Sequence, residues 1–256
     1  MSAGKKQEQG NMTLVGHLKE IRNRIAVSVI VLIVAFFVCF SIIKPLANGM
    51  LEMGLNSGFQ YVYLSPSELL TSYFKLALIL AVVVTSPVLI FQVWGFISPA
   101  LSDKEKRAIR PALLGGIAFF CMGAAFSYFV ALPFMIQFLV NFSQSDFIHS
   151  SISVASYLDF MIGMLLTFGL VFEEPMLAFV LTSLGALSPQ VLRAVRSYAI
   201  PIIFFLAAII TPPDVVSQFM VAVPMIVLYE LSILISAAVY RRKQREQDDD
   251  EEDDDE

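Results

Sequence analysis

The stretch FGLVFEEPMLAF, residues 168–179, places two adjacent acids, Glu173 and Glu174, inside an apolar run too long for a soluble core. A charged side chain at the centre of a bilayer costs about 3 kcal/mol on insertion scales, so a membrane helix that carries one faces protein or a water-filled recess. Neighbouring helical residues point about 100° apart, so the two acids cannot face one pocket equally. The stretch predicts an intramembrane polar site at Glu173, with a purely structural hydrogen bond to another helix as the alternative.

The composition indicates a membrane protein. Hydrophobic residues make up 57% of the 256 residues and charged residues only 15%, whereas soluble domains carry about 25% charged residues. The charges are grouped, which leaves long uncharged runs between them. We therefore expect a single integral membrane domain over residues 1–245.

The charged residues separate into a basic body and an acidic tail. Ten of the last eleven residues, Glu246–Glu256, are acids. The other 12 acids and the 17 bases give residues 1–245 a net charge of +5, although the whole chain carries −5. A block of like charges repels itself and buries no apolar surface, so residues 246–256 are expected to form a disordered cytoplasmic tail. A solvated leash and a docking site for a basic partner are both open as its role.

The apolar runs predict six membrane spans, since a spanning helix needs roughly 20 apolar residues. The predicted spans cover about 22–43, 68–97, 111–133, 157–187, 197–211 and 216–239. Pro175 is expected to kink the fourth span just after the glutamates. The fifth is so short that the last two spans form a hairpin expected to thin the bilayer locally. The predicted fold class is all-α, with six transmembrane helices in a cupped bundle.

Basic residues orient these spans, because cytoplasmic loops carry an excess of Lys and Arg. Fifteen of the 17 bases precede the first span, follow the sixth, or lie between the second and third or the fourth and fifth. Only Lys44 and Lys75 fall on the other side. We expect both termini in the cytoplasm and substantial extracytoplasmic loops after the first and third spans.

The sequence lacks the motifs of common enzyme classes. Neither His17 nor His149 belongs to an HExxH zinc motif, and no Gly-x-Ser-x-Gly elbow, Walker loop or Rossmann glycine pattern occurs. Cys39 and Cys121 both lie in apolar runs, where a thiol behaves as a small hydrophobe. We therefore expect no enzymatic activity, no cofactor, no metal site and no nucleic-acid partner.

Polar residues gather at the cytoplasmic side of the first two spans. His17, Glu20 and Arg24 share one face at the start of the first helix by their spacing, and Glu105 follows the second span. Two carboxylates suit guanidinium groups, which pair with them through two parallel hydrogen bonds. Ordinary anchoring at the membrane interface is the alternative for these residues.

A further polar group surrounds the short hairpin and comprises Asp214, Gln218 and Glu230. Asp214 is placed to cap the sixth helix through the amide of Val216 or Ser217. Glu230 lies in the cytoplasmic half of the hairpin, where a long charged side chain reaches the interface by snorkelling.

Five motifs in this order resemble those of the TatC family, the multi-spanning receptor subunit of the twin-arginine protein translocase. HLKEIRNR at 17–24 resembles the family's HLxELRxR, and FQVWGFISPALSDKEKR at 91–107 resembles its QxWxFxxPGLxxxER block. FGLVFEEP at 168–175 resembles FGxxFExP. The hairpin signatures are matched by TPPDVVSQ at 211–218 and LYE at 228–230. The chain departs from these patterns at Ile21, Ala100 and Lys106, where many members have Leu, Gly and Arg.

The resemblance implies a docking site for folded proteins that bear an Arg-Arg signal peptide, with transport driven by the proton-motive force. It assigns signal-peptide binding to a cytoplasmic set of residues: Glu20, Arg22, Phe96, Pro99 and Glu105. It assigns a functionally sensitive intramembrane acid to Glu173 and does not extend that role to Glu174. It assigns translocation or partner contact to residues of the hairpin: Asp214, Gln218 and Glu230.

The resemblance also implies single-span partners of the TatA and TatB type, and self-association into a complex with several receptor copies. A bacterial cytoplasmic (inner) membrane is the expected location. The alternative from another class is a proton-coupled small-solute transporter that uses Glu173, but the sequence shows no inverted repeat and no matching pair of broken helices. A purely structural assembly scaffold is the other alternative.

Overall fold

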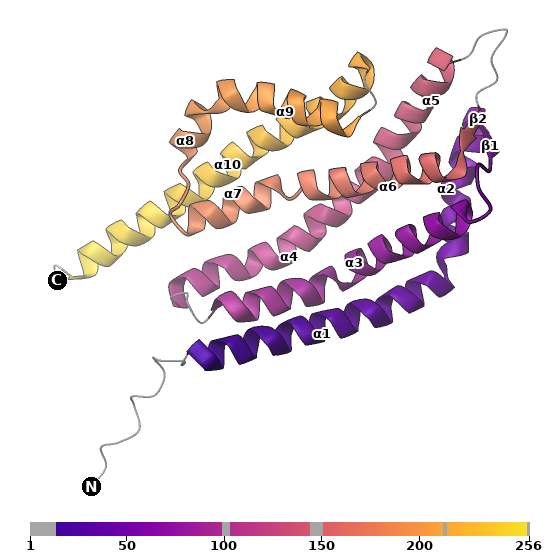
Figure 1. The fold of residues 1–256 in the computed structure, drawn as a ribbon. Coiled ribbons are helices and arrows are strands. Elements are labelled where there is room, and N and C mark those ends of the chain that lie inside the picture. Colours follow the sequence, from indigo (N-terminus) through magenta and orange to yellow (C-terminus); the bar gives the residue numbers. More distant parts are fainter. Residues whose placement is uncertain (1–13, 99–102, 144–150, 212–213, 255–256) are drawn as a thin grey trace.

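The computed structural model describes residues 14–98, 103–143, 151–211 and 214–254. Its long helices lie side by side in Figure 1, with α1 at one edge and the α9–α10 hairpin at the other. The elements, in chain order, are α1 (Leu14–Ser41), α2 (Ile43–Ser57), β1 (Gln60–Val62), α3 (Glu68–Ile97), α4 (Asp103–Phe126), the π-helical turn η2 (Ser127–Ala131), α5 (Leu132–Ser143), β2 (Ser151–Ser153), α6 (Val154–Val171), α7 (Glu174–Ser183), α8 (Pro189–Ala194), α9 (Arg196–Ile210) and α10 (Val215–Asp254).

Within the described ranges, five helical segments are long and apolar enough to cross a membrane. They are Lys19–Ser41, Glu68–Phe96, Pro111–Phe142, Val154–Ser183 and Val215–Arg245. These segments correspond to the first four predicted spans and the sixth, and the predicted class, an all-α membrane protein, is confirmed. The predicted fifth span is α9, an apolar helix of 15 residues, about 22 Å at 1.5 Å per residue. The count of six crossings therefore stays a prediction that depends on α9.

The fourth predicted span is broken at the glutamates, slightly earlier in the chain than the kink predicted just after them. Helix α6 ends at Val171 and α7 begins at Glu174, with Pro175 in its first turn. Proline lacks an amide hydrogen and fits the first turn of a helix, where that donor has no partner within the helix. The break therefore places Glu173 at a helix junction rather than within a continuous helix.

The predicted loops after the first and third spans contain regular structure. Helix α2 follows α1 almost directly, and α5 prolongs the third span beyond the π-helical turn η2. Strands β1 and β2 pair in parallel, with Gln60 opposite Ser151. In Figure 1, α2, both strands and the end of α5 gather at one end of the bundle. The chain thus forms a structured cap at the end predicted to be extracytoplasmic.

The carboxylate of Glu68 fastens this cap. Its Oε2 accepts hydrogen bonds from the amides of Leu64 (2.7 Å) and Ser65 (3.3 Å), and the bond from Ser65 is half of a capping box. Its Oε1 accepts from the amide of Ala155 at 2.8 Å and from the hydroxyl of Ser153. Only 8% of Glu68 is exposed. One side chain therefore joins the start of α3 to the start of α6.

A second polar link lies nearby on the same two helices. The ammonium of Lys75 on α3 donates to both carboxylate oxygens of Asp159 on α6, at 3.0 and 2.7 Å. Both side chains are about half exposed. The start of α6 is capped by Ser153, whose hydroxyl oxygen accepts from the amide of Ser156. Asp159, one turn further along α6, forms the ion pair with Lys75.

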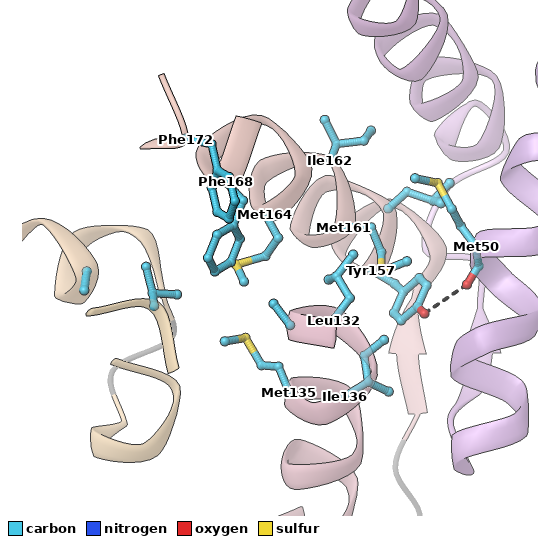
Figure 2. Close-up of a cluster of buried hydrophobic side chains, with 14 of the residues drawn as sticks. Met50, Leu132, Met135, Ile136, Tyr157, Met161, Ile162, Met164, Phe168 and Phe172 are labelled. Atoms are coloured by element: carbon cyan, nitrogen blue, oxygen red, sulfur yellow. Dashed lines mark hydrogen bonds between the residues drawn. The ribbon is translucent and has the colours of Figure 1, made fainter. Parts of the chain in front are cut away.

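The buried core lies where α6 crosses α5 and approaches α2, as Figure 2 shows. Tyr157, 1% exposed, donates from its hydroxyl to the carbonyl of Met50 on α2 at 3.0 Å. The other large, fully buried side chains around it include Leu132, Met135, Ile136, Met161, Met164 and Phe168. A buried hydroxyl with a partner avoids the cost of desolvation, so Tyr157 fixes the position of α2 against α6.

The acidic tail differs from expectation. Helix α10 continues through the acidic run to Asp254, whereas residues 246–256 were predicted to be disordered. The physical reason is that extending an existing helix adds one hydrogen bond for each residue fixed, so no new nucleus is needed. The helix thus prolongs α10 beyond its apolar part.

Candidate functional site

Glu20 and Arg24 form an ion pair at the start of α1. The guanidinium of Arg24 donates from Nε (3.0 Å) and from Nη2 (2.6 Å), and both bonds end on Oε1 of Glu20. The two residues lie one helical turn apart, as their spacing predicts. The side chain of Glu20 is 22% exposed. The carboxylate is therefore accessible and already engaged by a guanidinium from its own helix.

Helix α3 holds Arg24 from the other side. Its Nη1 lies 3.4 Å from both the backbone carbonyl and the side-chain Oε1 of Gln92. A Cβ placed on Gly95 would lie 2.2 Å from Nη1, so only glycine leaves room for the guanidinium there. Gln92 and Gly95 thus shape a seat for Arg24. Gln92 belongs to the motif at 91–107, but no contact with Arg24 was predicted for either residue.

The other residues assigned to signal-peptide binding are placed less completely. Arg22 is exposed on α1, and Phe96 is half-buried near the end of α3. Pro99 lies outside the described residues. Glu105 lies in α4, but its side chain is outside the described part of the structure. The structure therefore brings Glu20 to the end of α3 and leaves the position of the second carboxylate undescribed.

Glu173 lies at the junction of α6 and α7 and packs against α4. A Cβ placed on Gly116 would lie 3.0 Å from Oε2 of Glu173, so the two helices meet closely at this glycine. Both Glu173 and Glu174 are half-buried. Glu174 is the first residue of α7 and Glu173 its N-cap, where the helix dipole favours negative charge. The sequence predicted a site at Glu173 but not its contact with Gly116.

The hairpin residues have structural partners of their own. Oδ1 of Asp214 accepts from the amide of Ser217 at 2.6 Å, which confirms the predicted cap of α10. The side-chain amide of Gln218 donates from Nε2 to the backbone carbonyl of Phe204 on α9 at 2.9 Å. Glu230 pairs with Arg196 at the start of α9 at 2.7 Å, a more specific role than the predicted snorkelling. The last two of these contacts hold α9 against α10.

Basic residues gather at one end of the bundle, and the orientation predicted from them stays a prediction. Figure 1 shows that α1 begins, α10 ends and α4 starts at one end. Those elements carry most of the basic residues, including Lys19, Arg22, Lys106, Arg241 and Arg242. Among the described residues, no three His, Cys, Asp or Glu side chains gather closely enough to hold a metal ion.

Known proteins resemble the chain along most of its length. A family model described as "Sec-independent protein translocase protein (TatC)" matches residues 16–224. The Sec-independent protein translocase protein TatC of Helicobacter pylori (strain J99) is 43% identical over 221 residues, which cover 86% of this chain and 87% of that protein. Its counterpart from Aquifex aeolicus is 37% identical over 225 residues, 87% and 93% of the two chains.

Solved structures agree with the sequence matches. A crystal structure of a twin arginine translocase receptor, TatC, superimposes with a TM-score of 0.75 at 35% identity and covers 87% of this chain and 99% of that chain. A second TatC structure, in the detergent DDM, gives a TM-score of 0.76 at 36% identity. This chain therefore belongs to the TatC family of Sec-independent protein translocase proteins.

Proposed function

We propose that this chain, an integral multi-pass protein of the bacterial inner membrane, is the translocase subunit that binds twin-arginine signal peptides on its cytoplasmic face. Glu20 and Glu105 supply the carboxylates that receive the two guanidinium groups, and Arg22, Phe96 and Pro99 shape the site. The bound peptide presents its folded cargo to the pore that the complex assembles. Family membership supports this proposal, and no comparison supports the alternative of a small-solute transporter.

The observation that carries the proposal is the state of Glu20. Its carboxylate is accessible near the start of α1, and the guanidinium of Arg24 already bonds to it. A carboxylate held in this way has the geometry and charge that an arginine ligand requires. The half-buried aromatic ring of Phe96 on α3 lies four residues beyond Gln92, which contacts the same arginine. Arginine also stacks on aromatic faces, which supports a role for Phe96.

The polar residues outside the signal-peptide site serve translocation and assembly of the complex. Glu173, set at a helix junction against Gly116, serves as the intramembrane polar site during translocation. Asp214, Gln218 and Glu230 order the α9–α10 hairpin, on which single-span subunits of the TatA and TatB type dock. Several copies of the chain assemble, and the proton-motive force drives transport. The subunit works by binding, without enzymatic chemistry or a cofactor.

Equilibrium binding of a synthetic signal peptide tests the proposal. Purified protein in detergent is titrated with a peptide carrying Arg-Arg and with the same peptide carrying Lys-Lys. We expect wild type to prefer Arg-Arg, and Glu20→Gln combined with Glu105→Gln to lose that preference. Glu52→Gln, which removes an exposed acid from α2 at the opposite end, is the matched control and should bind as wild type does. Equal binding of both peptides by wild type would refute the proposal.

A further inference from the structure

We propose that Arg24 competes with the signal peptide for Glu20. Arg24 is bonded to Glu20 in the resting protein and must leave before an arginine of the peptide forms its full pair with that carboxylate. The inference rests on the proposed function of Glu20 and adds to it a regulatory role for a residue of the same helix. It assigns to Arg24, Gln92 and Gly95 a task that differs from binding the ligand itself.

The hydrogen bonds of Glu20 explain why the two arginines compete. Both donors of Arg24 end on Oε1, at 3.0 Å from Nε and 2.6 Å from Nη2. A strong arginine–carboxylate pair uses two parallel hydrogen bonds, one to each oxygen. With Oε1 occupied, a peptide guanidinium reaches only Oε2 and gains one bond of the two. The full pair therefore forms only after Arg24 has moved away.

The local charge favours competition over a supporting role. Residues 19–24 contain one acid, Glu20, and three bases, Lys19, Arg22 and Arg24. Arg24 neutralises Glu20 and so weakens its attraction for a ligand with two positive charges. If Arg24 merely oriented the carboxylate, its charge would still oppose the ligand at close range. The positive charge of Arg24 thus lowers the affinity of Glu20 for a cationic ligand.

Further acceptors beside Arg24 lower the cost of its departure from Glu20. Nη1 already lies 3.4 Å from two oxygens of Gln92 on α3, so these acceptors remain available when Glu20 is taken over by the peptide. The side chain of Arg24 is 28% exposed, which also gives it access to water. The guanidinium therefore keeps its Gln92 acceptors and can bond to water when it leaves Glu20, instead of being left without a partner.

Competition predicts the size and pattern of the effect. Apparent affinity falls by the fraction of protein in which the site is open. An exposed ion pair one helical turn apart is weak, so removing Arg24 should raise affinity about two- to sixfold. The affinities for the Arg-Arg and Lys-Lys peptides should rise by the same factor, since both peptides encounter the same fraction of protein in which Arg24 occupies Glu20.

The test measures affinity for both peptides in Arg24→Gln and in Lys19→Gln. Lys19 is an exposed base on the same helix, so its replacement removes an equal charge without opening Glu20. We expect Arg24→Gln to bind the Arg-Arg peptide more tightly than wild type, and by a larger factor than Lys19→Gln. An affinity that is unchanged, reduced, or raised only as much as in Lys19→Gln would overturn the inference.

Gly95→Ala provides a variant that keeps every charge. Its methyl group would lie 2.2 Å from Nη1 and 2.8 Å from Nη2 of Arg24, so the guanidinium must shift out of the position in which Nη2 donates to Glu20, while alanine favours the helix. Tighter peptide binding supports the inference and weaker or unchanged binding overturns it, even where Arg24→Gln fails to fold. Failure of the proposed function looks different, because wild type itself would then show no preference for Arg-Arg.

Discussion

Glu173 on the α6–α7 junction and Gly116 on α4 lie in direct contact, because a Cβ added to Gly116 would stand only 3.0 Å from Oε2 of the carboxylate. Glycine lets two helices approach closely in a membrane, where packing rather than the hydrophobic effect holds helices together. The glycine thereby determines where the intramembrane acid lies.

The first prediction concerns this contact. Gly116→Val should displace the carboxylate of Glu173 and reduce export of a twin-arginine reporter severalfold, while leaving binding of the signal peptide unchanged. Gly163→Val is the matched control, because nothing lies within 4 Å of a Cβ at Gly163 on α6. Export rates and peptide affinities of the two variants are compared with those of wild type. Full export by Gly116→Val would show that the position of Glu173 is not critical.

The second prediction concerns Glu68. Glu68→Gln replaces one acceptor oxygen with an amide group that faces the backbone donors around it, so the cap should lose stability and the protein should unfold at a lower temperature. Thermal unfolding in detergent measures the loss. Glu52→Gln, at an exposed position, should change stability by no more than about 0.5 kcal/mol. Equal melting temperatures for both variants would mean that the bonds of Glu68 contribute little.

The third prediction concerns the ion pair between Lys75 and Asp159. Both side chains are about half exposed, so each single reversal, Lys75→Asp or Asp159→Lys, should cost only about 0.5–1 kcal/mol. The double reversal restores opposite charges and should recover most of that loss. Unfolding of the three variants in detergent gives the coupling energy. Purely additive losses would show that the pair is not formed in the membrane protein.

The fourth prediction concerns the acidic end of α10. Truncation after Arg245 should leave binding of the signal peptide unchanged, because the acids that we propose as receptors for the arginines lie on α1 and α4. The same titration with the Arg-Arg peptide measures this. Loss of binding on truncation would instead indicate that the acidic run takes part in docking.

The long apolar runs were sufficient to predict most of the helices. The break between α6 and α7 followed from Pro175, and the cap of α10 from Asp214, because both depend on neighbours in the sequence. Helices that satisfy their own hydrogen bonds within one segment are the easiest elements to recognise in a membrane protein.

Contacts between distant segments could not be predicted in this way. The pairing of Gln60 with Ser151 joins strands of three residues, too short to show an alternating pattern. Gln92 and Gly95 lie in an apolar helix and acquire a role only because α3 packs beside α1. Half of the hydrogen bonds that Glu68 accepts come from a segment more than 80 residues away. Such roles arise from packing, which one sequence does not reveal.

The most direct test of signal-peptide recognition is a double-mutant cycle between the protein and its ligand. Glu20→Gln is combined with replacement of each peptide arginine by glutamine, and all four affinities are measured for each pair. A direct charged hydrogen bond predicts a coupling energy of at least about 1 kcal/mol between Glu20 and one of the arginines. Coupling energies below about 0.5 kcal/mol for both arginines would indicate independent sites, and would contradict the role of Glu20 as a receptor for the twin-arginine motif.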